Sequence, residues 1–525
     1  MSMKKSNFFL GVILSSLVLT AGCTSSSETE EVVPSPSEPS MMDGDSASVE
    51  VVAPSLVSVT FKCDANPYQL GEDITCDIVD DSLVIGRIPN VVDNKLLIPD
   101  ITFIGDQILI DGVQYHQGEE YDFRKPVKIT LKTATCSKDY MVYVHSFTGL
   151  PVVWIETEGR KDITSKDEYL TASFRLEEGV VTRGAGDVVS ESVMIKGRGN
   201  SSWDFAKKPY RLKFNRKVSL LGEPEDKSWV LIANYNDKTM LRNQICFYMG
   251  KMSKLDWTPR AHFVELMLNG KYNGTYLLCE KVKVSKHRVN IGDDGLLLEM
   301  DAYAPYENDT RFFVTSHLPR VVSIKEPECE FGDDTFNFAI DLMQEAENAL
   351  FSDNFTDEEE GWRKYLDEES FIEWYLINEI SKNADAVSWS SIFFNYKRGG
   401  KIKMGPIWDL DQTFGNCEEG EIVQTPDGFH ITHMAWYARL FQDPLFVSRV
   451  KERYDYFYRQ KEDIFREINE NAQYLRYAVV ENESKWHTLY TYSWKNPYIW
   501  GSYDNEVQFM KQWTNARMEW LKNAY

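Results

Sequence analysis

Apolar and polar residues alternate in several short segments between residues 55 and 148. Examples are LVSVTFKC, PVKITLKTA and DYMVYVH, and Gly, Asp and Asn residues lie between such segments. A period of two is typical of strands with one buried face, and short strands at this spacing are typical of a β-sandwich. We therefore expect an all-β, Ig-like domain over 55–148. No cluster of catalytic residue types occurs in it, which favours a spacer or adhesion module.

The chain from 149 to 525 combines strand and helix patterns. A strand, a Gly-rich turn and a second strand are predicted in VMIKGRGNSSWDFAKKPYRLKFN, and a capped helix in NDKTMLRNQICFYMGKMS. Two strands joined by an Asn-Gly turn follow in AHFVELMLNGKYNGTYLLCEKVKV. Residues 335–400 are mostly helical in pattern, and helical spacing returns over 430–525. These patterns predict an α+β fold for this part.

The first 23 residues have a basic start, an apolar centre and small residues before Cys23. This order predicts a secretory signal peptide rather than a structural membrane helix. The ending LTAGC is similar to the lipobox of bacterial lipoproteins, which implies that Cys23 is lipidated; the alternative is an ordinary cleaved signal. Residues 24–54 are rich in Ser, Pro and Glu and predict a disordered acidic tether. The acidic residues after Cys23 resemble surface-export signals, so we expect a surface-exposed outer membrane lipoprotein of a Gram-negative bacterium.

Charge narrows the range of partners. The 525 residues carry a net charge of −24, and binding to nucleic acid needs a basic surface, so nucleic acid is excluded as a partner. Seven cysteines besides Cys23 show no CxxC spacing, and it stays an open question whether two of those in the β-domain form a disulfide. The aromatic residues of SKWHTLYTYSWKNPYIWGSYDNEVQFMKQW either pack in a core or bind a glycan or peptide.

Two aspartates lie two positions apart in KMGPIWDLDQTFGN, residues 403–416. On an extended segment Asp409 and Asp411 would point the same way, and adjacent carboxylates repel each other unless a cation or a proton lies between them. Mg²⁺ is commonly held by one or two carboxylates together with substrate phosphates. The alternative is an Asx turn that ends a strand, with both acids solvated.

A Gly-rich turn upstream offers backbone N–H groups and hydroxyls to an anion; its residues are Gly197, Arg198, Gly199, Asn200 and Ser201. Lys213 follows among several other basic residues, and a helix and two more strands come next. That is the order of parts in the small lobe of a protein kinase. Asp385 lies about two dozen residues before Asp409, with a predicted hairpin between them. A kinase places its catalytic-loop Asp and its metal-binding Asp in the same relation.

The chain from about 150 to 525 resembles the CotH family of atypical kinases. The resemblance rests on GRGNSSW, KKPYRLKF, NDKTMLRN, YNGTYLLCEKV, IKEP and WDLDQTFGN, in this order. It implies a two-lobed, kinase-like domain over 149–525 that binds ATP with Mg²⁺ or Mn²⁺ and phosphorylates Ser or Thr of extracytoplasmic proteins. The layout with an N-terminal β-domain is similar to surface lipoproteins of Bacteroidetes.

The resemblance also implies roles for single residues. Asp385 would be the catalytic base or a metal-orienting acid, and Asp409 the main metal ligand with Asp411 beside it. Lys213 and the Gly-rich turn would contact the ATP phosphates, while four residues would face the cleft or adjoin the adenine: Arg242, Asn243, Glu280 and Val282. Ser390 would be a further metal ligand, but it departs from the pattern, because many relatives have a metal-binding Asn there and a hydroxyl binds metal more weakly. Two hypotheses therefore stay open, an active kinase and a non-catalytic surface binding or adhesion protein on the same scaffold.

Overall fold

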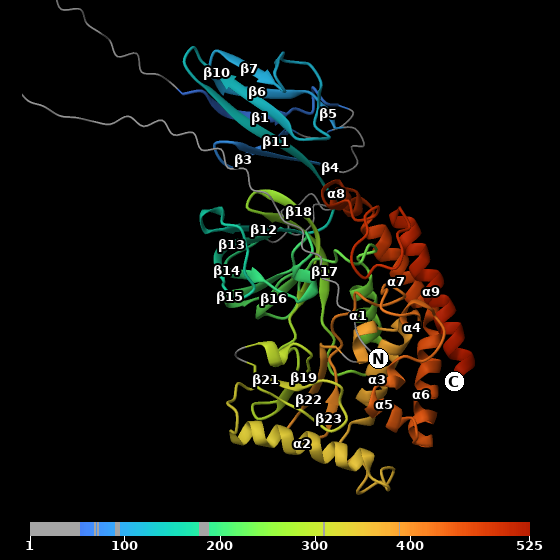
Figure 1. Cartoon of the computed structure of the whole chain (residues 1–525). Helices are drawn as coiled ribbons and strands as arrows, with labels where there is room; N and C mark the ends of the chain where they lie inside the picture. Colours follow the sequence, from blue (N-terminus) through green and yellow to red (C-terminus); the bar gives the residue numbers. More distant parts are fainter. Residues whose placement is uncertain are drawn as a thin grey trace, which may run out of the picture. The chain divides into compact units, whose positions relative to one another are not determined.

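The computed structural model of the chain describes residues 53–525, apart from 68–69, 71–72, 90–94, 178–187, 308–309 and 388. The predicted signal peptide, Cys23 and the tether up to residue 52 lie outside the described residues. Residues 52–525 form one compact unit. Helices and sheets are combined in it after a β-rich N-terminal region, which confirms the α+β class (Figure 1). None of the helices in the described ranges has the length and apolar character of a membrane-spanning segment.

The N-terminal region contains two main sheets that share a core. Alternate residues of its strands are buried, as the period of two predicts; in β10, Ile129 and Leu131 are fully buried. Strands β4 and β11 pair in parallel, so the larger sheet is mixed, and the Ig-like topology stays a prediction. The strand order of the smaller sheet is β2 (Ile74–Thr75), β1 (Ser55–Phe61) and β6 (Pro99–Ile104). The order of the larger sheet is β3 (Asp77–Ile78), β4 (Leu83–Pro89), β11 (Ser137–Phe147), β10 (Val127–Lys132), β7 (Gln107–Ile110) and β8 (Val113–Gln114). Strands β5 (Leu96–Leu97) and β9 (Tyr121–Asp122) form a separate pair.

A closed barrel follows. Its interior is filled by alternate residues of each strand, such as Leu212 and Phe214 of β15. The predicted Asn-Gly turn lies between β17 and β18 at Asn269 and Gly270, whose φ angles of 50° and 75° are those that a tight hairpin turn needs. The strand order is β12 (Val152–Thr157), β13 (Leu170–Glu177), β14 (Val188–Gly197), β15 (Tyr210–Val218), β16 (Asp226–Ile232), β18 (Lys271–Glu280) and β17 (Ala261–Leu268).

A five-stranded sheet and the helices make up the rest of the unit around one large core. The sheet order is β20 (Phe312–Phe313), β21 (Val322–Glu326), β19 (Leu296–Met300), β22 (Ile392–Tyr396) and β23 (Ile402–Met404). Helix α3 is buried along most of its length, and α5–α9 gather on one side of the barrel and this sheet (Figure 1). The helices are α1 (Arg242–Met252), α2 (Asp334–Phe351), α3 (Glu368–Ser381), α4 (Glu421–Gln424), α5 (Ala435–Leu440), α6 (Pro444–Arg459), α7 (Lys461–Tyr474), α8 (Arg476–Trp486) and α9 (Tyr503–Ala524).

Helix α1 begins later than its sequence predicts. The Asn-Asp pair before it does not cap the first turn directly; Asp237 lies in a turn over 233–241 and accepts a hydrogen bond from the backbone N–H of Arg242 at 2.8 Å. Met240 in that turn has a φ of 58°, which interrupts the helical path. The first helical residue is therefore Arg242 rather than a residue next to Asp237.

Candidate active site

A small cavity of about 40 Å³ lies where the Gly-rich turn, the end of β16, the start of α1 and the loop after β23 meet. Four residues that the sequence singles out line it, namely Arg198, Asn243, Asp409 and Asp411. They come from three stretches far apart in the sequence. The fold thus brings the two aspartates and the Gly-rich turn to one place.

The segment that carries the two aspartates is not a strand. Strand β23 ends at Met404, and Asp409 has a φ of 62°, in the left-handed region. The expectation that Asp409 and Asp411 point the same way because they lie on an extended segment is therefore wrong. Both nevertheless line the cavity. Burial, followed by the charges of Asp409 and Asp385, raises the pKa of Asp411 above its usual range, so the acids do lie close enough to repel one another.

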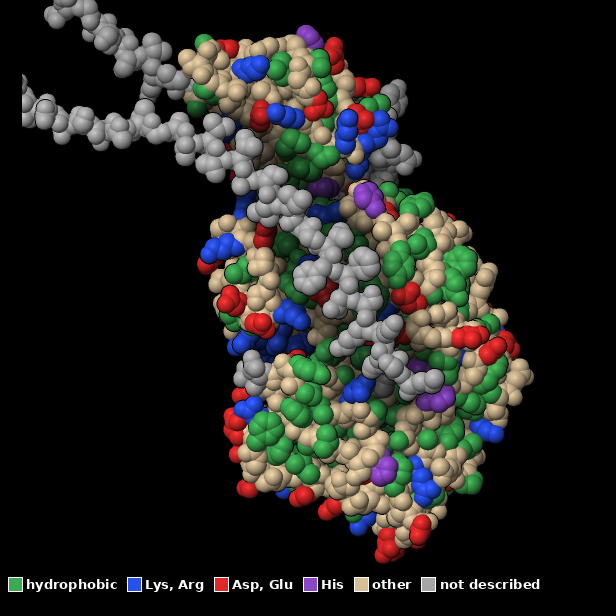
Figure 2. Space-filling model, viewed as in Figure 1, with side chains coloured by type: hydrophobic (Ala, Val, Ile, Leu, Met, Phe, Trp, Pro, Cys, Tyr) green, Lys and Arg blue, Asp and Glu red, His purple; other side chains and the backbone are tan. Residues whose placement is uncertain are grey.

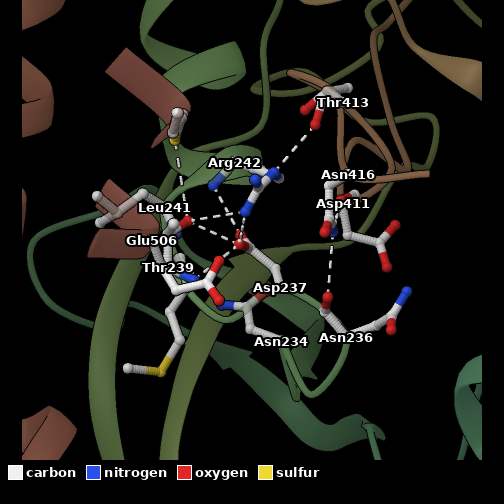
Figure 3. A network of polar contacts seen from close by, with 12 residues as sticks. Asn234, Asn236, Asp237, Thr239, Leu241, Arg242, Asp411, Thr413, Asn416 and Glu506 are labelled. Atoms are coloured by element: carbon white, nitrogen blue, oxygen red, sulfur yellow. Dashed lines mark hydrogen bonds and ion pairs between the residues drawn. The ribbon is translucent and has the colours of Figure 1, made fainter. Parts of the chain in front are cut away.

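The side chains of Asn243 and Arg242, at the start of α1, fix this loop, and Figure 3 shows the contacts of Arg242. Asn243 accepts a hydrogen bond from the backbone N–H of Leu410 at 3.1 Å. Arg242 donates from Nε to the carbonyl of Thr413 at 3.0 Å and forms an ion pair with Asp237. Arg242 is only 1% exposed and Asp237 0%, so Arg242 does not face the cleft as the sequence suggests. It holds the loop instead.

Asparagines support the loop from the other side. Asn416 donates from Nδ2 to the carbonyls of Asp411, at 2.9 Å, and Asn236, at 3.1 Å. Asn496, near the C-terminus, donates to the carbonyl of Asn236 at 2.8 Å and to Oδ1 of Asn416 at 2.9 Å. Figure 3 shows the side chains of Asp411 and Asn236 pointing to the same side, away from the Arg242–Asp237 pair. The Asp411 carboxylate is thereby kept free for the cavity.

Asp385 lies beside this loop. It belongs to a short 3-10 helix, Ala384–Val387, that follows the end of α3, and it accepts a hydrogen bond from Nε2 of Gln412 at 3.1 Å. Burial, and after it the charge of Asp409, raises the pKa of Asp385 to about 7. The charge of Lys495 acts in the opposite direction, and Lys495 is also paired with Glu419 at 2.9 Å. No sequence motif indicates Lys495, which lies more than a hundred residues further along the chain.

The hydroxyl next to Asp409 belongs to Ser391 rather than to Ser390. Ser391 donates from Oγ to Oδ2 of Asp409 at 3.2 Å, and its backbone N–H donates to Glu299 at 3.0 Å. Ser390 is half-buried, and its side chain makes no hydrogen bond to any residue that the structure describes. Its predicted role as a metal ligand stays a prediction.

Glycines shape the Gly-rich turn by making room. A Cβ on Gly197 would lie 2.3 Å from the ring of Trp203, and Gly199 has a φ of 86°. The backbone N–H of Gly197 donates to Ser165 and that of Arg198 to Pro209, so neither is left for an anion. The rest of the predicted anion-binding turn, Asn200 and Ser201, is exposed and half-buried, respectively.

Arg198 is the member of this turn that reaches the aspartates. Its guanidinium lies over the ring of Trp408, 5.6 Å from the centroid. Burial lowers the pKa of Arg198, and the charges of Asp409 and Asp411 oppose that shift. The Arg198 cation thus faces the two carboxylates across the cavity. An anionic group bound there through a metal on the carboxylates would also be contacted by Arg198.

The predicted phosphate-binding lysine, Lys213, is exposed on β15 and does not line the cavity. Arg211, two residues earlier on the same face, is half-buried, and its Nε is buried without a hydrogen-bond partner in the described residues. Burial, followed by the charge of Arg211, lowers the pKa of Lys281 to about 7. Figure 2 shows Lys and Arg side chains gathered between the barrel and the five-stranded sheet. The sequence does not distinguish Arg211 from its basic neighbours.

The residues predicted to adjoin adenine lie at the end of β18 and just after it. Glu280 is fully buried and bonded to the guanidinium of Arg260 at 2.8 and 2.9 Å. Its backbone N–H donates to the carbonyl of Arg260 at 3.0 Å. Val282 is 8% exposed. The Glu280 side chain is therefore committed to an internal ion pair, and contact of this segment with adenine stays a prediction.

Comparison with protein families matches residues 195–521 to the family described as CotH kinase protein. This chain belongs to that family. The match covers more than half of the chain and confirms the resemblance found in the sequence. All of the aspartates discussed above lie inside the matched range.

Individual proteins are also similar to this CotH-family chain. The inner spore coat protein H of Bacillus subtilis (strain 168) is 25% identical over 234 residues, which cover 43% of this chain. The chain spans 60% of that relative's length. A chain from Bacteroides thetaiotaomicron, provisionally described as a glycoside hydrolase, is 13% identical, with 55% of this chain and 81% of that chain covered and a TM-score of 0.18. That likeness is too weak to support an argument.

The carboxylates of this CotH-family chain fit a magnesium-type site. Within the described residues, no group of three or more His, Cys, Asp or Glu is placed to hold a metal ion. Asp409 is exposed and Asp411 half-buried at the same cavity, and Mg²⁺ needs only one or two carboxylates when phosphate oxygens and water supply the other ligands. Asp409 and Asp411 would therefore hold the metal together with a phosphate.

Replacing Arg242 with Met should destabilise the protein strongly, because it leaves the buried Asp237 carboxylate without its cation. We expect the free energy of unfolding to fall by about 3–5 kcal/mol. Lys522→Met is the matched control, since Lys522 pairs with Asp455 at an exposed site, and its loss should cost about 0–1 kcal/mol. Urea titration followed by tryptophan fluorescence measures both, and equal, small effects would contradict the role given to Arg242.

Proposed function

We propose that this CotH-family protein is a membrane-anchored, extracytoplasmic protein kinase that transfers phosphate from ATP to Ser or Thr of surface or extracellular proteins. The convergence of Asp409, Asp411 and Arg198 around one cavity, with Asp385 close to Asp409 beside it, supports this proposal. Phosphoryl transfer needs little covalent chemistry from the protein, and catalysis comes mainly from positioning and from stabilisation of charge. The side chains at this cavity would supply both the positioning and the stabilisation of charge.

Each side chain has a definite task in this scheme. A divalent metal held by Asp409 and Asp411 would neutralise charge on the phosphates. Arg198 would contact phosphate oxygens from the opposite wall. Asp385 would orient the acceptor hydroxyl and accept its proton, and its pKa of about 7 is near the value at which a general base works well at neutral pH.

The nucleotide would extend beyond the small cavity. At about 40 Å³ the cavity is well below the roughly 300 Å³ of the smaller ligand pockets, so it accommodates only the metal and the terminal phosphate. Arg211 would supply positive charge beside Lys281, whose own pKa burial lowers to about 7, and the buried Nε of Arg211, which has no hydrogen-bond partner in the described residues, would donate to a phosphate. In this two-lobed interpretation the barrel is the small lobe, and the sheet and helices are the large lobe.

A non-catalytic binding protein on the same scaffold is the second candidate. Ser390 favours it, because a hydroxyl is a weaker metal ligand than the amide oxygen that many kinases place there. The Ser391 hydroxyl, bonded to Asp409 at 3.2 Å, does not replace that amide. The exposed aromatic residues near the C-terminus would bind a glycan or peptide in either case: Tyr490, Tyr492, Trp494, Tyr498 and Trp500.

Transfer of labelled phosphate from ATP to a Ser/Thr-rich protein should separate the two candidates. We expect wild-type protein to transfer phosphate in the presence of Mg²⁺ or Mn²⁺, and Asp385→Asn to lose about 10²–10⁴-fold in rate, which is the usual contribution of a general base. Asp334→Asn, at the start of α2 and outside the cavity, is the matched control. Equal rates for wild type and Asp385→Asn would exclude the assigned role, and no transfer by wild type would favour the binding protein.

Membrane anchoring requires a separate test, because Cys23 lies outside the described residues. If Cys23 carries lipid, Cys23→Ala should move the protein from the membrane fraction to the soluble fraction of the cell envelope. Fractionation followed by immunoblotting measures this. Wild type and Cys23→Ala in the same fraction would show that no lipid on Cys23 anchors the protein.

A further inference from the structure

A second cavity, of about 330 Å³, has no lining residue in common with the carboxylate site. Segments of the N-terminal β-rich region, the turn between β17 and β18, and helix α8 form its walls. Its volume is within the range of about 300–1,000 Å³ in which small ligands are commonly bound. Neither the proposed kinase reaction nor the family match assigns it a role.

Positive charge is concentrated at this cavity although the chain carries a net charge of −24. The lining includes one acidic residue, Glu481, and five basic residues: Lys95, Arg124, Lys125, Lys271 and Lys485. Lys95 is paired with Glu481 at 3.5 Å, and Arg124 with Asp122 at 2.7 Å. For Lys125, Lys271 and Lys485, the described part of the chain provides no carboxylate partner. Lys485 donates to the carbonyl of Tyr272, and burial, followed by the charge of Lys271, lowers the pKa of Lys485. Like charges at one cavity repel each other, and an anion would relieve that repulsion.

Aromatic rings form a wall of the same cavity. His145 lies between Tyr143, at 6.3 Å between ring centroids, and Tyr272, at 5.3 Å. Burial and the neighbouring cations, Lys95 first, lower the pKa of His145 to about 3, so its ring is neutral at physiological pH. Neutral aromatic faces stack well on the flat faces of sugars and nucleobases. A ligand that combines such a ring with a negative charge would contact both the aromatic residues and the lysines of the cavity.

We propose that this cavity binds a small ring-bearing anion, one that carries a carboxylate or phosphate group on one or two rings. The anionic group would lie against Lys125, Lys271 and Lys485, and a ring against Tyr143, His145 and Tyr272. An acidic sugar and a nucleotide share this chemistry. The site is independent of the proposed kinase reaction, because it uses none of the residues assigned there.

Isothermal titration calorimetry at low salt tests the proposal with three probes: digalacturonic acid, AMP and neutral cellobiose. We expect at least one of the two anions to bind and cellobiose not to bind. In the double lysine variant, Lys271→Gln/Lys485→Gln, the affinity for the anion should fall by at least about tenfold, since each charged contact contributes a large part of such binding. Lys401 is exposed and lies outside both cavities, so the control variant Lys401→Gln should leave the affinity for the anion unchanged.

Asp409→Ala separates this site from the carboxylate site. Anion binding that persists in Asp409→Ala but weakens in the double lysine variant supports the proposal, whether or not the protein transfers phosphate. Binding of digalacturonic acid alone identifies an acidic sugar as the ligand class, and binding of AMP alone a nucleotide. The proposal is overturned if neither anion binds, if cellobiose binds equally well, or if the double lysine variant binds as tightly as wild type. Because both lysines are exposed, circular dichroism should show an unchanged fold.

Discussion

The buried ion pair of Asp237 and Arg242 determines how the candidate active site is arranged. Removing both charges from water is costly, and such a pair is tolerated only when hydrogen bonds satisfy the remaining groups. Here Thr239 donates from Oγ1 to Asp237 at 2.6 Å, and Arg242 donates from Nε to the carbonyl of Thr413 at 3.0 Å. The pair therefore ties the turn after β16, the start of α1 and the aspartate loop to one another. Asn243, the next residue, then fixes Leu410 between the two aspartates.

The C-terminal part of the chain completes the arrangement from the other side. Asn496 and Ser493 bond to Asn236, and Lys495 opposes the shift in the pKa of Asp385. Helix α8 contributes to both cavities in a similar way. Its Asn482 accepts a hydrogen bond at 2.9 Å from Lys207, which lines the small cavity, while neighbouring residues of α8 line the large one. Segments far apart in sequence thus share the support of one site.

The sequence predicts the main elements and the chemistry, but not the details that tertiary contacts decide. Alternation identifies β15, yet it cannot say that Arg211 rather than Lys213 is the half-buried residue, because both lie on the same face and the neighbouring strands decide which is covered. The order of the motifs along the sequence predicts that Asp385 and Asp409 belong to the same site. The left-handed backbone of Asp409 and the burial of Arg242 leave no pattern in the sequence, since both depend on contacts made across the fold.

Metal-dependent nucleotide binding is the most direct test of the idea that Asp409 and Asp411 exist to hold a cation against phosphate. Calorimetric titration of ATP, with and without Mg²⁺ or Mn²⁺, should show that wild-type protein binds ATP more tightly when metal is present. Asp409→Ala should lose that dependence on metal, and Asp411→Ala should lose less of it. Equal affinity for ATP in wild type and Asp409→Ala, with metal present, would contradict the account and leave the two aspartates as residues of a turn.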